Sequence, residues 1–508
     1  MGRMSTVVAG LIVLLASCSG KAERASQSPA ATGGVEARPN VVVVVVDDLR
    51  WDEFGAAGHP WIETPNIDRL AAEGALFAQA FHAVSLCSPN RASILTGQYP
   101  SRHGIIDNVS RALASHRLVT FPQALQQAGY RTAFLGKWHM GNDPTPRPGF
   151  DYWVSFPGQG RSINPELFED GRLHLVPGYT TDLLTDRAVA FIERESGGPF
   201  MLYLAHKAIH PDITQLNDGS VDPSTPEQYV PAPRHRGRYE GKIFPRRGNV
   251  VATLAQLDQQ PALRNALALL DTTPDPGAGA RIAGGDSVPV FTDESIQRRA
   301  EMLLAVDEGL GRIMAALEGR GILDQTAVIL TSDNGFFFGE HALTTERRLP
   351  YEESIRNPVM IRYPALVAAG SRPAALVSSV DIAPTVLDLA GAPIGPQVQG
   401  RSLVPVLKGD TAGWRQAVLV EFTSYENPFP HLVDMDYRAI RTDRYKYIHW
   451  IKFPDLDELY DLAEDPLEQH NLAGSPAMAQ VKAGLQAELG RLVLGAMGLG
   501  GGGASHLP

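Results

Sequence analysis

The feature that most constrains the fold is a run of six valines that follows Asn40 and ends at Val46. An unbroken apolar run of this length is typical of a strand that is buried on both faces in the middle of a parallel sheet. A second apolar run, from Thr326 to Thr331, repeats the pattern. The two runs therefore predict inner strands of an α/β sheet.

Oxygen-bearing side chains follow both of these predicted strands directly. Asp47 and Asp48 come after the first strand, and Asp333 and Asn334 come after the second. In open α/β sheets, ligands bind at the edge where the strands have their carboxyl ends. Carboxylate and amide oxygens are also the ligands that hard divalent cations prefer. These residues predict a cation site, with the alternative that they are ordinary turn residues.

Basic and imidazole side chains follow two further apolar runs. Lys137 and His139 come after the run 132–135, and His210 follows the run 200–205. If the chain stays extended, Lys137 and His139 point the same way. A single histidine is more often a structural residue, but four strand ends that carry such side chains favour a site.

Cys87 is one of only two cysteines in the 508 residues, and it begins a segment in which a helix is predicted to start. Ser88 can cap this helix, Pro89 suits its first turn and Gly97 suits its end. Arg91 then lies one helical turn beyond Cys87 on the same face. The alternative is a buried structural cysteine beside a capped helix.

The pattern Cys-x-Pro-x-Arg followed by Leu-Thr-Gly closely resembles the signature of type I sulfatases. The resemblance runs from Pro39 to about Leu472, apart from an insertion. It implies an alkaline-phosphatase-like α/β sandwich, in which helices flank a large, mostly parallel central sheet. It also implies a smaller C-terminal domain with a four-stranded antiparallel sheet and a helix. Three other segments match in the expected order: Thr64-Pro65-Asn66-Ile67-Asp68, Gly136-Lys137-Trp138-His139 and Ser332-Asp333-Asn334-Gly335.

The same resemblance implies the chemistry of Cys87. In that family the cysteine is oxidised after translation to formylglycine, and the hydrate of this aldehyde is the nucleophile. One hydroxyl attacks sulfur and the alcohol of the ester departs. The other hydroxyl then loses its proton and expels sulfate, which regenerates the aldehyde. Formylglycine-generating machinery is therefore an expected partner. The usual signature has serine where this chain has Asn90, which leaves the effect on maturation open.

The resemblance further implies a calcium ion at the carboxyl edge of the sheet, with magnesium as the alternative because the ligand types alone do not exclude it. The modified cysteine and a substrate oxygen would complete the coordination shell of the ion. The implied protein ligands are Asp47, Asp48, Cys87, Asp333 and Asn334.

Catalytic roles also come from the resemblance. Arg91 would stabilise the hydrate, and His139 would take part in its proton step. Lys137 would contact sulfate and the leaving group, whereas His210 would protonate the departing oxygen. The family has a further sulfate-binding residue, usually lysine, and the matching position here is Arg347. Arginine keeps the positive charge and can offer two donors, although its reach differs.

The N-terminus resembles a bacterial lipoprotein signal peptide, predicted over residues 1–17. Arg3 precedes a short apolar run, and the lipobox-like ending would make Cys18 the lipidated first residue. Residues 18–38 are predicted to form a flexible tether. We therefore expect an exported periplasmic or outer-membrane lipoprotein of a bacterium, which touches the membrane only through its lipid. The alternative is a soluble protein with an apolar N-terminus.

The rest of the chain divides into a catalytic domain at 39–410, a C-terminal subdomain at 411–497 and a tail at 498–508 that is predicted to be disordered. An insertion at about 212–292 interrupts the catalytic domain and contains a run of basic residues around two aromatic residues. Such a run is usually a solvated surface. The alternative is a wall that binds a sulfated or uronic-acid-bearing chain.

The net charge of -11 and a pI of about 5.7 argue against nucleic-acid binding. The sequence thus predicts a sulfatase that acts on a sulfated saccharide and resembles bacterial glycan exo-sulfatases of the N-acetylglucosamine-6-sulfatase-like branch. One alternative is a phosphonate or phosphate monoester hydrolase with nearly the same site. A second alternative is a non-catalytic, glycan-binding descendant.

Overall fold

The computed structural model describes residues 38–499, except for 196, 226, 269–290 and 425–428. The predicted signal peptide, nearly all of the tether, part of the insertion and nearly all of the tail lie outside the described residues. Within those residues, none of the helices has the length and apolar content that a bilayer crossing requires.

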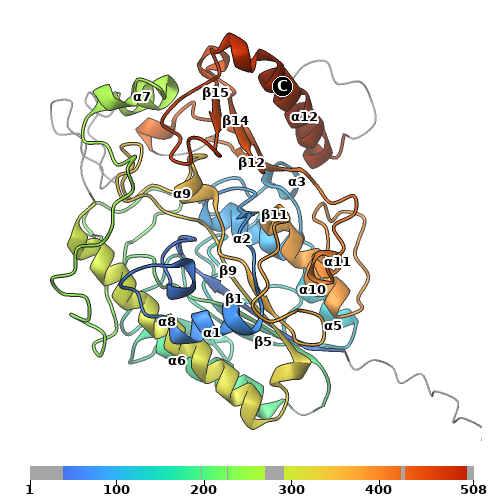
Figure 1. The fold of residues 1–508 in the computed structure, drawn as a ribbon. Helices are drawn as coiled ribbons and strands as arrows, with labels where there is room; N and C mark the ends of the chain where they lie inside the picture. Colours follow the sequence, from blue (N-terminus) through green and yellow to red (C-terminus); the bar gives the residue numbers. More distant parts are fainter. Residues whose placement is uncertain (1–37, 196, 226, 269–290, 425–428, 500–508) are drawn as a thin grey trace, which may run out of the picture. The chain divides into compact units, whose positions relative to one another are not determined.

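A nine-stranded sheet forms the centre of the described chain (Figure 1). Strand β1 lies between β9 and β8 and runs parallel to both, so that Val46 is opposite Ser332 and Val45 is opposite Ala205. The predicted parallel sheet is confirmed, and its antiparallel pairs involve β10 and β2 on one side and β6 and β7 on the other. In order across the sheet, the strands are β2 (Ala75–Leu76), β10 (Met360–Arg362), β9 (Thr326–Ser332), β1 (Asn40–Val46), β8 (Phe200–Ala205), β4 (Arg131–Gly136), β5 (Tyr152–Ser155), β6 (Glu166–Glu169) and β7 (Arg172–Leu175).

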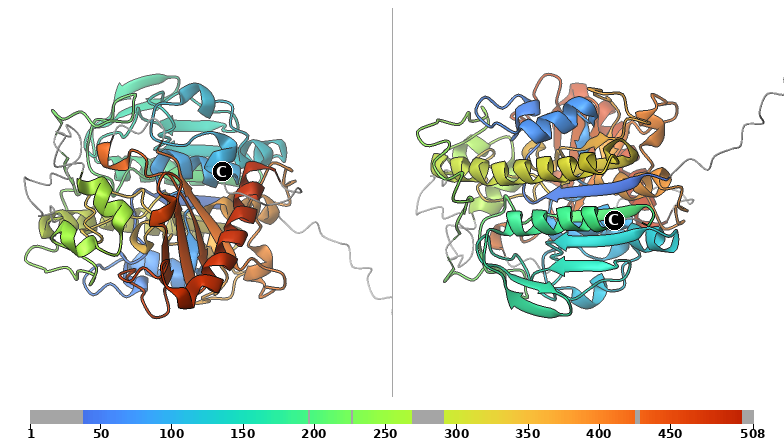
Figure 2. Two further views of the ribbon diagram at one scale, coloured as in Figure 1. Left: turned by 90° about the horizontal axis from the view of Figure 1, so that it is seen from above. Right: turned by 90° about the horizontal axis from the view of Figure 1, so that it is seen from below.

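The valines of β1 alternate between two separate hydrophobic cores. Val42, Val44 and Val46 pack in the core that includes α1 (Pro65–Glu73), α6 (Thr180–Arg194) and α8 (Asp293–Gly319). The other three pack in the core that includes α2 (Cys87–Thr96), α5 (Phe121–Gln127) and α10 (Ile382–Leu389). Helices α6 and α8 run side by side (Figure 2, right). Each buried valine contributes about 1.5–3 kcal/mol relative to exposure, which explains why both faces of this strand must be covered.

A second sheet carries the C-terminal part of the chain. Its strands follow one another antiparallel in the order β12 (Ala417–Phe422), β13 (Tyr437–Thr442), β14 (Tyr445–Trp450) and β15 (Glu458–Asp461). Helix α12 (Ala479–Met497) covers one face (Figure 2, left). The other face shares a core with residues around Cys87, which links this sheet to the segment that begins α2.

Lys446 is buried at this junction and donates to the carbonyl of Pro350, and its ammonium nitrogen lies 3.0 Å from the carboxylate of Glu352.

The remaining strands and α-helices of the described chain are short. They are a parallel pair formed by β3 (Ala80–Phe81) and β11 (Val377–Ser378), and the helices α3 (Pro100–His103), α4 (Ala112–Ser115), α7 (Pro261–Ala268), α9 (Glu352–Ile355) and α11 (Val404–Leu407).

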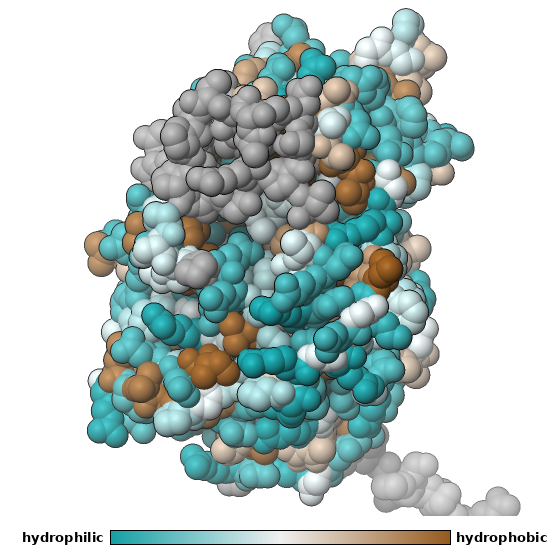
Figure 3. Space-filling model, turned by 90° about the vertical axis from the view of Figure 1, so that its left-hand side faces the viewer, coloured by the Kyte–Doolittle hydropathy of each residue, from teal (hydrophilic) through white to brown (hydrophobic). Residues whose placement is uncertain are grey.

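The basic run of the insertion is mostly neutralised by acidic partners. Arg234 contacts Asp182 and Glu308, Arg238 contacts Glu63, and Arg246 and Arg247 also have carboxylate partners. The two aromatic residues of the run are buried in the core rather than exposed. Figure 3 shows the left-hand side of Figure 1 as a mainly hydrophilic face with small, separate hydrophobic groups. These observations favour the ordinary solvated surface over a glycan-binding wall.

Candidate active site

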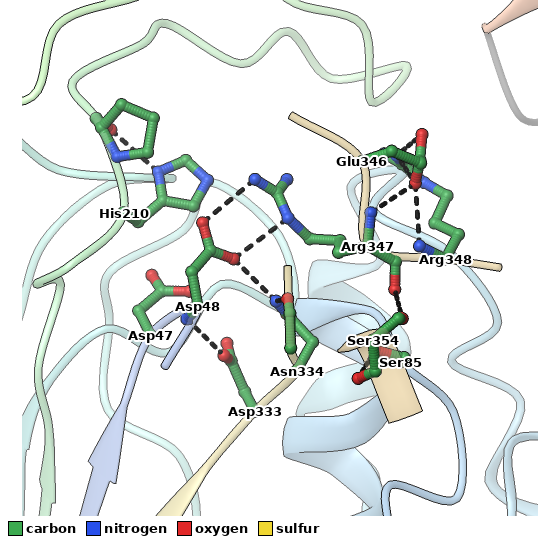
Figure 4. Close-up of polar contacts among 12 residues, drawn as sticks. Asp47, Asp48, Ser85, His210, Asp333, Asn334, Glu346, Arg347, Arg348 and Ser354 are labelled. Atoms are coloured by element: carbon green, nitrogen blue, oxygen red, sulfur yellow. Dashed lines mark hydrogen bonds and ion pairs between the residues drawn. The ribbon is translucent and has the colours of Figure 1, made fainter. Parts of the chain in front are cut away.

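The register of β1 and β9 brings together the four predicted metal ligands that follow these two strands. Because Val46 pairs with Ser332, the residues that follow both strands meet at one point of the carboxyl edge. The backbone N–H of Asp48 donates to Asp333 Oδ1 at 3.1 Å, and Asn334 Nδ2 donates to Asp48 Oδ1 at 2.7 Å. Figure 4 shows these side chains converging beneath His210 and Arg347.

Cys87 is fully buried at the first position of α2. The expectation that Ser88 caps this helix is wrong, because the helix begins two residues earlier, at Cys87, and Leu86 occupies the N-cap. The Ser88 hydroxyl instead donates to the backbone carbonyl of His139 at 2.6 Å. Gly97 ends the helix with a φ of 67°, as expected for a left-handed C-terminal residue.

Burial raises the pKa of the Cys87 thiol to about 12, although Lys137 acts to lower it. The thiol is therefore protonated at neutral pH. Because only the thiolate is a strong nucleophile, an unmodified cysteine at this position is poorly suited to attack a substrate.

Three cationic side chains contact the buried carboxylates, and Arg91 reaches two of them because its Nη2 also lies 3.7 Å from Asp47 Oδ1. Arg91 Nε donates to Asp333 Oδ2 at 2.8 Å, and Lys137 Nζ donates to Asp47. Arg347 contacts Asp48 through two atoms, Nε and Nη2, both at 3.0 Å. Burial acts to lower the pKa of this guanidinium, but the Asp48 carboxylate holds it above its ordinary value.

The two predicted histidines also lie at this edge of the sheet. His139 has a φ of 63°, so the chain does not stay extended after β4 and the argument from alternation fails, even though both Lys137 and His139 lie in the site. His210 Nδ1 donates to the carbonyl of Pro211 at 2.8 Å, so its Nε2 is the acceptor of the neutral ring. A nitrogen of His210 lies within 4.8 Å of a carboxylate oxygen of Asp48 and of Cys87 Sγ.

The predicted site residues all lie around the end of β1, and each of them is at most 8 % exposed. They are Asp47, Asp48, Cys87, Arg91, Lys137, His139, His210, Asp333, Asn334 and Arg347.

The donor set fits a hard divalent cation. Asp47, Cys87 and Asp333 each offer one atom within 4.8 Å of the others. Asp47 Oδ1 and Asn334 Oδ1 are buried without a hydrogen-bond partner among the described residues. Burying such oxygens without partners is unfavourable, and carboxylate and amide oxygens are the ligands that calcium and magnesium prefer. A cation at this point would satisfy both atoms.

Sequence reasoning missed two residues that hold this site in place. Asn90, where the signature usually has serine, donates through Nδ2 to the backbone carbonyl of Asp333 at 2.6 Å. Arg299 of α8 is fully buried and donates to the backbone carbonyl of Asp48 at 2.8 Å. A signal for Arg299 did exist, because it lies at helical spacing between the apolar residues Ile296 and Leu303.

We predict that Arg299→Met lowers the free energy of unfolding by about 3–5 kcal/mol, because it removes one partner of a buried ion pair and leaves the other without compensation. That other partner is Glu53, whose carboxylate accepts from Arg299 Nη2 at 2.8 Å. Urea unfolding of the full chain measures the loss. The matched control is Arg298→Met on the same helix, since Arg298 is half exposed and its ion pair with Glu294 should contribute less than about 1 kcal/mol. Equal losses in both variants would contradict the prediction.

The sheet order and the buried charged site at its carboxyl edge define a class, that of alkaline-phosphatase-like hydrolases. Residues 39–392 match the protein-family model described as sulfatase, and residues 339–494 match that described as the C-terminal part of N-sulphoglucosamine sulphohydrolase. The chain therefore belongs to the sulfatase family.

Similar proteins support this assignment. The chain is 34 % identical over 493 residues to an N-acetylglucosamine-6-O-sulfatase from Bacteroides thetaiotaomicron, with 87 % of this chain and 84 % of that protein covered. A solved structure of a protein in complex with its substrate D-glucosamine-2-N,6-O-disulfate is similar with a TM-score of 0.73 and 31 % identity, over 90 % of this chain and 98 % of that one. The phosphonate monoester hydrolase of Agrobacterium radiobacter has the same fold, with a TM-score of 0.71 and 24 % identity over 90 % and 96 % of the two chains.

Proposed function

We propose that this protein hydrolyses sulfate esters of saccharides, with 6-O-sulfated glucosamine derivatives as the substrate class. The proposal goes beyond family membership. It is supported by the 34 % identity to the N-acetylglucosamine-6-O-sulfatase and by the 31 % identity to the protein solved with D-glucosamine-2-N,6-O-disulfate.

The observation that carries the proposal is the setting of Cys87. A protonated, buried thiol lies at the start of a helix among three carboxylate–cation pairs. Formylglycine made from Cys87 would supply a hydrated aldehyde as the nucleophile, and Ca²⁺, or Mg²⁺ as the alternative, would supply positive charge for the sulfate group. The helix N-terminus favours negative charge at this point.

The residues of the chain have separable tasks in this proposal. Asp47, Asp48, Asp333 and Asn334 would hold the cation, together with the modified cysteine. Arg91 keeps Asp333 oriented and places positive charge near the start of α2. Preorganised charges of this kind stabilise negative charge that develops in a transition state.

Two histidines would transfer protons, and two basic side chains would bind the sulfate group. His139 lies next to the first turn of α2, as expected for a base near the nucleophile. His210 Nε2 has no hydrogen-bond partner among the described residues, and this nitrogen would have to take up a proton before it could give one to the departing sugar oxygen. Lys137 and Arg347 already lie on the ligand carboxylates Asp47 and Asp48. An anionic substrate would accept hydrogen bonds from the N–H groups of Lys137 and Arg347 that these carboxylates do not use.

Parallel assays of an aryl sulfate, an aryl phosphate and an aryl phosphonate test the proposed reaction. We expect the matured enzyme to have its highest kcat/KM on the sulfate. Sulfated sugars then test the substrate class, with 6-O-sulfated N-acetylglucosamine expected to release sulfate faster than sugars sulfated at other positions. A preference for the phosphorus esters would favour the alternative hydrolase, and no turnover of any ester would favour the non-catalytic alternative.

We predict that Arg347→Ala raises the activation free energy on every sulfate ester by on the order of 2–4 kcal/mol, as expected when an oxyanion donor is lost. Arg347→Lys should keep most of the activity, because an ammonium group restores the charge that is usual in the family. Steady-state kinetics on an aryl sulfate and on a sulfated sugar measure both variants. The matched control is Arg348→Ala, since Arg348 points to Glu346 at 2.9 Å instead of to Asp48. If Arg347→Ala slows only the sugar substrate, Arg347 reads the sugar and Arg348 becomes the next candidate for the sulfate contact.

We also propose that the protein is exported as a lipoprotein that is anchored through Cys18. The support is the N-terminal sequence alone, in which Arg3 and a short apolar run precede a lipobox-like ending. Labelling of the cells with a fatty-acid analogue and a Cys18→Ala variant tests the anchor. Equal labelling of both forms would contradict it.

A further inference from the structure

A short hairpin within the insertion contacts one side of the site. Gln215 pairs with Val221, and the N–H of Leu216 donates to the carbonyl of Ser220 at 2.8 Å. The hairpin is tied to the catalytic domain at Asn217, whose side chain accepts from Asn142 Nδ2 at 2.6 Å. Its residues come directly after the segment that carries His210, so the insertion reaches the proposed site from the side of β8.

The orientation of the Gln215 amide is fixed by its contacts. Its Nε2 donates to the carbonyl of Gly219 at 2.9 Å, and a carbonyl can only accept. Its Oε1 therefore faces the other way, where it accepts from Gln159 Nε2 at 2.9 Å and contacts His139 Nε2 at 2.6 Å. Rotating the amide by half a turn would set its oxygen against the Gly219 carbonyl, so the assignment of oxygen and nitrogen follows from the network.

This contact decides which nitrogen of His139 carries a proton. Because Gln215 Oε1 has no hydrogen to give, His139 Nε2 must be the donor at 2.6 Å. Burial, with Lys137 and Arg91 nearby, holds the pKa of His139 well below its usual range, so the ring is neutral and its Nδ1 keeps a lone pair.

His139 Nδ1 faces the first turn of α2, where it lies 3.4 Å from Ser88 Oγ. The single proton of that hydroxyl is directed to the His139 carbonyl at 2.6 Å instead. The lone pair of Nδ1 is thus left without a short donor among the described residues, and it lies beside the first turn of the helix that begins at Cys87.

We propose that Gln215 is a positioning residue for His139: it holds the proton on Nε2 and thereby presents Nδ1 as the proton acceptor toward Cys87. The inference deepens the proposed function and rests on it, since it names the atom of His139 that would take the proton. A histidine that serves as a base depends on a second group that fixes its tautomer and ring orientation, and the loss of such a group is costly. Here that group comes from the insertion.

The test uses Gln215→Leu in the full chain, with Gln215→Ala as a second variant in case leucine does not fit. Both remove the acceptor for His139 Nε2–H. The expected result is a kcat about 10–100-fold lower on an aryl sulfate, as for other partners that orient a functional histidine, with little change in KM. The matched control is Asn217→Ala, which removes an anchor of the same hairpin without touching His139 and should keep the wild-type kcat.

A second readout does not depend on turnover. Long-range proton–nitrogen NMR spectra of ¹⁵N-histidine-labelled protein report the tautomer of each ring, and a His139→Asn variant identifies the signals of His139. Wild-type protein and Asn217→Ala should show a neutral ring protonated on Nε2, and both Gln215 variants should show a mixture of tautomers.

An unchanged His139 tautomer in both Gln215 variants would overturn the inference, as would an equal loss of kcat in Gln215→Leu and Asn217→Ala. If wild-type protein turns over no sulfate ester, the proposed function fails. The NMR spectra would still decide whether Gln215 fixes His139.

Discussion

Cys87→Ala should abolish sulfate-ester turnover, lowering kcat/KM by more than about 10⁴-fold, the scale seen when a covalent nucleophile is removed. The reason is that the remaining charged groups can bind and polarise a sulfate ester but cannot attack sulfur. Kinetics on an aryl sulfate with the matured wild type as reference give the ratio.

The fold should survive this change, because Cys87 is a small, buried side chain that forms no disulfide within the described part of the chain. Circular dichroism and thermal unfolding should therefore remain close to wild type, which separates loss of chemistry from loss of structure. If the variant keeps more than a tenth of the wild-type rate, the nucleophile is another group.

Asp333→Ala should lower both bound metal and activity. The carboxylate of Asp333 accepts from the N–H of Asp48 and from Arg91, so its loss also leaves a buried guanidinium without its short carboxylate contact. We expect kcat/KM to fall by at least about 100-fold, the upper range for disturbed metal surroundings. Elemental analysis of the purified protein and kinetics with added Ca²⁺ or Mg²⁺ measure the two effects.

Asp307→Asn is the matched control for Asp333→Ala. Asp307 is also a buried carboxylate, but it accepts from the N–H groups of Asn66 and Ile67 at the start of α1, away from the site. This variant should lose stability and keep its metal content and its kcat. Full activity of the wild type after exhaustive chelation would contradict a role for the cation.

The main sheet and most of the site could be predicted because the sequence signals are local. The valine run predicts a strand with two covered faces, and the observed packing of alternate valines into two cores confirms it. Asp47 and Asp333 follow such strands directly, so only the pairing of β1 with β9 was needed to bring them together.

Two of the residues that sequence reasoning missed, Gln215 and Asn90, depend on tertiary contacts that have no local pattern. Gln215 reaches His139 across 76 positions of sequence, and Asn90 reaches the carbonyl of Asp333 across 243. The Ser88 cap was wrong for a related reason. Capping rules describe an isolated helix end, whereas the Ser88 hydroxyl has a better partner in the carbonyl of His139.

The basic run of the insertion also needed the structure. The sequence shows that the arginines are close together along the chain. It does not show that Asp182, Glu308 and Glu63, which are distant in sequence, form ion pairs with them. A cluster of like charges in sequence is therefore weak evidence for an anionic ligand until its partners in space are known.

Peptide mass spectrometry of the segment that contains Cys87 tests the central claim most directly. The protein is purified in active form from a host with formylglycine-generating machinery and is digested, and the two forms of the peptide are quantified. We expect the mass of the aldehyde at position 87, in a fraction of the peptide that rises in proportion to specific activity among preparations. Fully active protein that carries only the unmodified Cys87 thiol would contradict it.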